Sequence, residues 1–91
     1  MISMTIKGVR VIDLMLIDLL HKANSISYAL ELNSGYRYIV LCLEAVERGE
    51  KLEFHEKREV RDNLIDLCKF LNVSYEYLLN KAYRQVNPDQ K

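Results

Sequence analysis

The stretch "LCKFLNVSYEYLLN", residues 67–80, decides the fold class of this 91-residue chain. Its apolar residues recur at intervals of three and four on both sides of Asn72, Val73 and Ser74, which is the period of two amphipathic α-helices. Ser74 is a residue type that caps helices, because its hydroxyl accepts a hydrogen bond from an amide in the first turn. The stretch therefore predicts one helix that ends near Asn72 and another that begins after Ser74.

Residues 8–33 carry a long apolar stripe of helical period. Asn24 or Ser25 can cap a second, shorter helix, so the sequence leaves one helix and two helices open. The stripe is wide, and it is only about three heptads long, so we expect it to pack inside a globule or at the core of a dimer. The residues that we predict at an oligomer interface are Val9, Ile12, Leu16 and Leu19.

Residues 36–48 predict the next helix, which follows an Asn-Ser-Gly turn and is closed by Gly49. At 100° per residue, its polar positions form one narrow stripe on an otherwise apolar surface. A helix of this kind belongs near the centre of a fold. The stripe consists of Arg37, Glu44 and Arg48, with Leu41 among them.

Charged residues of both signs fill residues 47–62, as on a solvated surface. From about Lys57 the pattern becomes cleanly amphipathic and continues to Asn72, and the last helix follows Ser74. We therefore expect an all-α protein: a compact four- to five-helix bundle over residues 8–86. A short extension, residues 1–7, precedes it, and a polar tail, residues 87–91, follows.

The composition gives the chain no strong affinity for charged partners or for membranes. Its 13 basic and 13 acidic residues cancel, so no net field attracts nucleic acid or anionic lipid. The longest apolar run, residues 38–43, is far shorter than the roughly 20 residues of a membrane helix. Cys42 and Cys68 form no CxxC pair, which is typical of reduced core cysteines. We expect a cytoplasmic protein.

The sequence offers little chemistry for catalysis. Glu59 occupies the position four residues after His55, where the helical metalloprotease pattern requires a second histidine, and His21 has no histidine or cysteine near it in sequence. No serine lies in a nucleophile elbow, and no glycine-rich phosphate loop is present. We therefore predict a non-enzymatic binding protein without a cofactor, a metal or a small-molecule substrate.

Tyr36, Arg37 and Tyr38 are the best contact residues that the sequence suggests. Tyrosine combines a large apolar ring with a hydroxyl that tolerates water, so it favours interfaces as well as half-buried core positions. The three residues lie at the start of a predicted helix, and an exposed helix N-terminus attracts anions.

Residues 64–80 resemble the closing helices of Cro/repressor-type (XRE) helix-turn-helix domains, in which an apolar helix, an Asn-Val-Ser or Gly-Val-Ser joint and a short Leu-Leu helix complete a five-helix fold. "ERGEK", residues 47–51, is similar to the segment that follows the recognition helix in that family. The resemblance implies that residues 28–39 form the helix-turn-helix. It implies DNA contacts near Tyr36, Arg37, Tyr38, Arg48 and Lys51.

Two functions follow from these observations. The first is a small dimeric transcription regulator of divergent repressor type, which binds DNA weakly or through a partner. The second is a helical protein-interaction module, such as an adaptor, an inhibitor or a phage-encoded modulator, that does not bind nucleic acid. The joint at Asn72 favours the first, whereas the zero net charge and Glu44, which would repel phosphate, favour the second.

Overall fold

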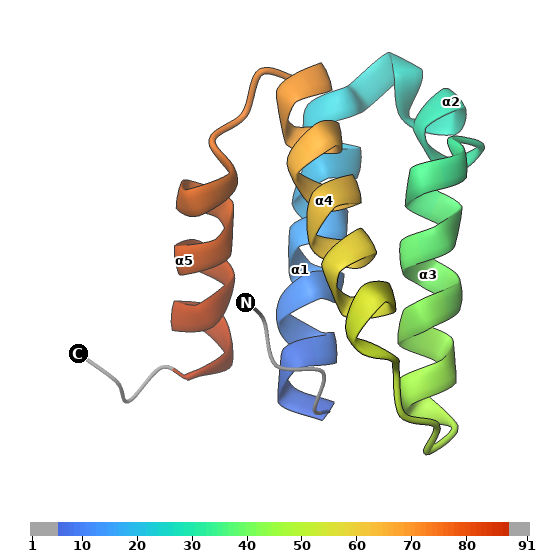
Figure 1. The fold of residues 1–91 in the computed structure, drawn as a ribbon. Coiled ribbons are helices and arrows are strands. Elements are labelled where there is room, and N and C mark those ends of the chain that lie inside the picture. Colours follow the sequence, from blue (N-terminus) through green and yellow to red (C-terminus); the bar gives the residue numbers. More distant parts are fainter. Residues whose placement is uncertain (1–5, 88–91) are drawn as a thin grey trace.

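The computed structural model of the protein describes residues 6–87, except for the side chains of Ile6 and Ser27. These residues form five α-helices and contain no β-strand, so the predicted all-α bundle is confirmed (Figure 1). Helix α1 begins at Ile6, two residues before the predicted start of the domain. The rest of the predicted terminal segments, residues 1–5 and 88–91, lies outside the described residues. The helices are α1 (Ile6–Ala23), α2 (Ser27–Glu31), α3 (Ser34–Glu47), α4 (Phe54–Phe70) and α5 (Tyr75–Val86).

The joint between α4 and α5 is built as its sequence predicts. Asn72 adopts the left-handed conformation, with φ at 57°, and the Val73 amide donates to the Cys68 carbonyl at 2.8 Å. This pattern satisfies a carbonyl that the end of a helix leaves without a partner. The Ser74 hydroxyl then accepts a hydrogen bond from the Tyr77 amide at 3.2 Å and caps α5. The three joint residues thus end one helix and start the next.

The first apolar segment is divided into two helices. Asn24 follows the last residue of α1 and turns into the left-handed conformation, with φ at 51°. A single 3-10 turn, Asn24–Ile26, leads into α2, which is only five residues long. Neither Asn24 nor Ser25 caps α2, because its N-cap position is held by Ile26 without a side-chain hydrogen bond.

The connection between α3 and α4 explains why α4 starts earlier than predicted. Gly49, with φ at 91°, closes α3 as expected. Glu53 and Glu56 then form a capping box, in which the Glu53 amide donates to the Glu56 carboxylate at 2.7 Å. Because this box stabilises the first turn, α4 begins at Phe54, three residues before Lys57.

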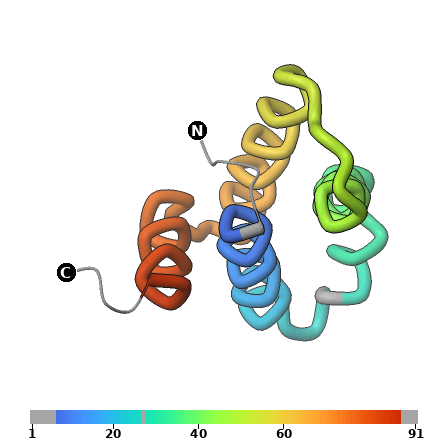
Figure 2. The backbone as a smooth tube through the Cα atoms, turned by 90° about the horizontal axis from the view of Figure 1, so that it is seen from below, coloured from blue at the N-terminus to red at the C-terminus, as the bar shows by residue number. Residues whose placement is uncertain are grey.

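Helix α1 is the centre of the bundle. In Figure 2 it lies between α5 on one side and α3 on the other, and α4 packs mainly against α3 and also contacts α5. The pair Asp18 and Lys81 joins α1 to α5 at the surface, with 3.4 Å between Oδ2 and Nζ. Large side chains with no exposed surface come from three helices, and they are Ile12, Met15, Leu19, Ile39 and Leu64.

The prediction of an oligomer interface on α1 is wrong in placing these residues at a surface. The four side chains are at most 4% exposed and belong to the core of a single chain. An apolar stripe has the same pattern whether it packs on its own chain or on a second copy, so the sequence did not distinguish the two cases. The residues concerned are Val9, Ile12, Leu16 and Leu19.

Candidate interaction surface

Asn33 caps α3 and occupies two backbone amides of its first turn. The Asn33 side-chain oxygen accepts hydrogen bonds from the Gly35 amide at 2.8 Å and the Tyr36 amide at 3.2 Å. This cap fixes where α3 starts. It also uses two of the donors through which a helix N-terminus would hold an anion.

The segment that the sequence suggested as one contact site does not present its three side chains together. Arg37 is exposed, whereas Tyr36 and Tyr38 are half-buried. Burial raises the pKa of Tyr36, and the negative charges of Glu31 and Asp13 raise it further. Tyr36 therefore lies on the side of α3 that faces α1 and α2, in surroundings that disfavour a phosphate.

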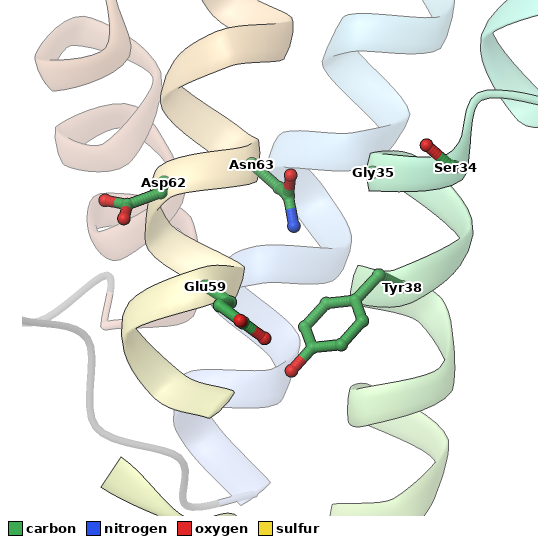
Figure 3. A pocket seen from close by; sticks show the side chains of 6 residues that line it. All are labelled: Ser34, Gly35, Tyr38, Glu59, Asp62 and Asn63. Atoms are coloured by element: carbon green, nitrogen blue, oxygen red, sulfur yellow. The ribbon is translucent and has the colours of Figure 1, made fainter. Parts of the chain in front are cut away.

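Tyr38 lies on the opposite side, in a groove between α3 and α4. Figure 3 shows its hydroxyl directed toward Glu59. Burial raises the pKa of Tyr38 and the interaction with Glu59 raises it further. Glu59 thus places one carboxylate in this groove, whereas the carboxylate of Asp62 is directed away from it and lies 3.3 Å from the Arg61 guanidinium. The volume of the groove is about 490 Å³, and it is lined by Ser34, Gly35, Tyr38, Glu59, Asp62 and Asn63.

Gly35 allows α3 and α4 to approach at the upper end of this groove. A Cβ atom at position 35 would lie 2.9 Å from the Asn63 side-chain oxygen and 3.1 Å from that of Asn33. A larger residue would force these carboxamides to move. Gly35, the second residue of α3, therefore has a packing role here.

The predicted basic contacts after α3 are exposed but are surrounded by acids. Arg48 caps the C-terminal end of α3, and its Nε donates to the Glu50 carboxylate at 2.9 Å. Lys51 is exposed. Residues 44–53 contain two cations and four acidic side chains, so this end of α3 is not a basic patch. The acids are Glu44, Glu47, Glu50 and Glu53.

The exposed side of α3 combines charges with one large apolar side chain. The predicted stripe is confirmed: Arg37, Glu44 and Arg48 are exposed, and Leu41 among them is 63% exposed. A hollow of about 440 Å³ lies beside Leu41. It is lined by Glu31, Tyr36, Arg37, Val40, Leu41 and Glu44. We call this hollow, together with Arg48, the α3 face.

Leu41 was not among the contact residues that the sequence suggested. The signal was present, because an apolar residue within a polar stripe is exposed in any helix that buries its other side. The contribution of Glu31 had no such signal, since it comes from α2 and reaches the α3 face only through the fold.

Groups with catalytic chemistry are dispersed in the described part of the chain. His21 and His55 are exposed on different helices. Cys42 and Cys68 are buried free thiols, and burial raises the pKa of both, that of Cys68 to about 11. Within residues 6–87, no three His, Cys, Asp or Glu side chains gather in a way that could hold a metal ion.

The sequence matches no protein-family model, no curated protein and no solved structure. Among the described helices, none combines the length and the apolar character needed to cross a membrane.

Proposed function

We propose that this chain is a small, non-enzymatic regulatory protein of divergent repressor-like type that acts by docking its α3 face onto a protein surface. The observation that carries the proposal is Leu41, which is 63% exposed at the middle of a charged stripe. Burying a leucine in an interface is worth about 1.5–3 kcal/mol, and charges around an apolar centre are typical of protein contacts. Leu41 has the position of such a centre.

The charges of the α3 face favour a protein over DNA. Much of the affinity of a DNA-binding surface comes from lysine and arginine contacts to phosphates. Here Arg48 is paired with Glu50, and Glu44 projects from the same stripe as Arg37. A phosphate backbone laid along α3 would meet these carboxylates, whereas a protein surface of mixed charge would complement them.

The repressor-like part of the proposal is supported by the order of the helices. Five helices occur in the described residues, and the joint at Asn72 to Ser74 ends α4 and caps α5 as the resemblance implies. This support concerns architecture. The binding partner is argued from the α3 face alone, because one fold carries many functions.

Direct DNA binding is the second candidate. Its support is the succession of a short helix, two residues and a longer helix, α2 and α3, with Arg37 exposed on the outer side of α3. This arrangement has the order of a helix-turn-helix, in which the second helix enters the major groove.

A photocrosslinking amino acid at position 41 tests the proposal. The protein is expressed in cells with p-benzoylphenylalanine in place of Leu41 and is crosslinked by light. We expect an adduct that is destroyed by protease and unaffected by nuclease. The control carries the same group in place of Gln85, which is exposed on α5. A nuclease-sensitive adduct at position 41 would overturn the proposal in favour of DNA. Equal yields at positions 41 and 85 would also reject it.

Fluorescence anisotropy with a random DNA duplex at low salt provides an independent measurement. We expect no binding by the intact protein. Binding that weakens as salt rises, and that Arg37→Ala abolishes, would support the second candidate, because phosphate contacts respond to salt in this way.

A further inference from the structure

The charges of the α3 face have a self-complementary order. Along the chain they run acidic, basic, apolar, acidic and basic. When this order is read backwards and set against the original, each acidic residue lies opposite a basic one, and the apolar residue lies opposite itself. A contact between two copies related by a two-fold axis requires a surface of this kind. The residues in order are Glu31, Arg37, Leu41, Glu44 and Arg48.

We propose that the protein that occupies the α3 face is a second copy of this chain, with the two α3 helices antiparallel and the two-fold axis at Leu41. This inference rests on the proposed function and names its partner. Arg37 of each copy then lies opposite Glu44 of the other copy. Each Leu41 enters the hollow beside Val40 and Tyr36 of the other copy.

The spacing along α3 fits this pairing. Arg37 lies four residues before Leu41 and Glu44 lies three residues after it, which correspond to about 6 Å and about 4.5 Å along the helix axis. The mismatch of about 1.5 Å is small for these long, flexible side chains. A parallel arrangement would place Arg37 beside Arg37 and Glu44 beside Glu44, and like charges repel. The charges therefore select the antiparallel arrangement.

A second pair of opposite charges joins Arg48 of each copy to Glu31, on α2, of the other copy. Arg48 lies seven residues after Leu41, so it meets the first turn of α3 in the other copy. Glu31 lies next to that turn, because it lines the same hollow as Arg37 and its charge acts on Tyr36. A carboxylate from α2 is thus available for Arg48, which requires Arg48 to exchange its exposed partner Glu50.

Charge-reversal variants test the pairing by light scattering and analytical ultracentrifugation. We expect the intact protein to dimerise reversibly with concentration. Arg37→Glu and Glu44→Arg should each weaken dimerisation at least tenfold, because each places two like pairs in the interface. An equimolar mixture of the two variants should form a mixed dimer, in which every pair is opposite again. Arg84→Glu, on the exposed side of α5, is the matched control and should leave dimerisation unchanged.

Three outcomes would overturn the inference: a chain that stays monomeric at all concentrations, a dimer unaffected by Arg37→Glu, or variants that do not recover when mixed. Circular dichroism shows whether each variant keeps its helices. The adduct formed from position 41 separates the two proposals. An adduct with a protein other than a second copy would overturn the dimer and keep the proposed function, whereas a nuclease-sensitive adduct would overturn the proposed function.

Discussion

Tyr36 and Tyr38 extend from opposite sides of α3, the first toward Glu31 and Asp13 and the second toward Glu59. Two residues correspond to about 200° of helical rotation, so neighbours of this spacing cannot share a face. Each ring helps to attach α3 to the rest of the bundle. Between them, Arg37 is left as the exposed member of the three.

The surroundings of Tyr38 predict a loss of stability at alkaline pH. Its pKa in the folded protein is raised above the ordinary value of 10.0, so the folded state keeps a proton that the unfolded chain releases. The stabilisation is therefore complete below about pH 10 and is lost as the pH rises above it. We expect the free energy of unfolding, measured with urea, to fall less steeply above pH 10 in Tyr38→Phe. Tyr28→Phe, at a side chain that is 74% exposed, is the control and should keep the original slope.

Two leucines with opposite exposure predict opposite effects on stability. Leu19 has no exposed surface, so Leu19→Ala should lower the free energy of unfolding by about 2–5 kcal/mol. Leu41→Ala removes the same atoms from an exposed site and should change it by less than about 0.5 kcal/mol at low protein concentration. Denaturant titration measures both. If Leu19→Ala changed the free energy of unfolding only slightly but abolished a dimer, Leu19 would instead belong to a dimer interface.

The left-handed backbone conformation of Asn72 limits which residues are tolerated at position 72. A β-branched side chain is strained in the left-handed conformation, so Asn72→Val should lower the free energy of unfolding by about 1–2 kcal/mol. Asn72→Gly is the control and should be as stable as the original or slightly more so, because glycine adopts this conformation without strain. Similar losses for the two variants would show that the Asn72 side chain, rather than its φ angle, matters.

The two thiols are expected to resist modification in the folded protein. Cys42 and Cys68 are buried, and their raised pKa values keep them protonated near pH 8. We expect a disulfide reagent such as DTNB to label neither thiol in the native protein within the time that fully labels the urea-unfolded chain. Rapid labelling of one native thiol would show that its helix opens readily.

Local sequence determined the helices and where most of them begin and end. The apolar period gives each helix its buried side. Ser74, Asn72 and Gly49 act within a few residues of themselves, so their roles are visible in the chain. The exposed stripe on α3 follows from the same period, because the positions opposite a buried face must meet solvent.

Only the tertiary structure decided what each helix packs against. The sequence of α1 was equally compatible with Leu19 and its neighbours lying in a dimer interface or in the core of one chain. In the structure, the other helices of the same chain bury them. Glu31 joined the α3 face because the turn after α2 brings it back beside Tyr36. Such contacts join residues from separate helices, and a periodic pattern records which side of a helix is apolar but not which surface covers it.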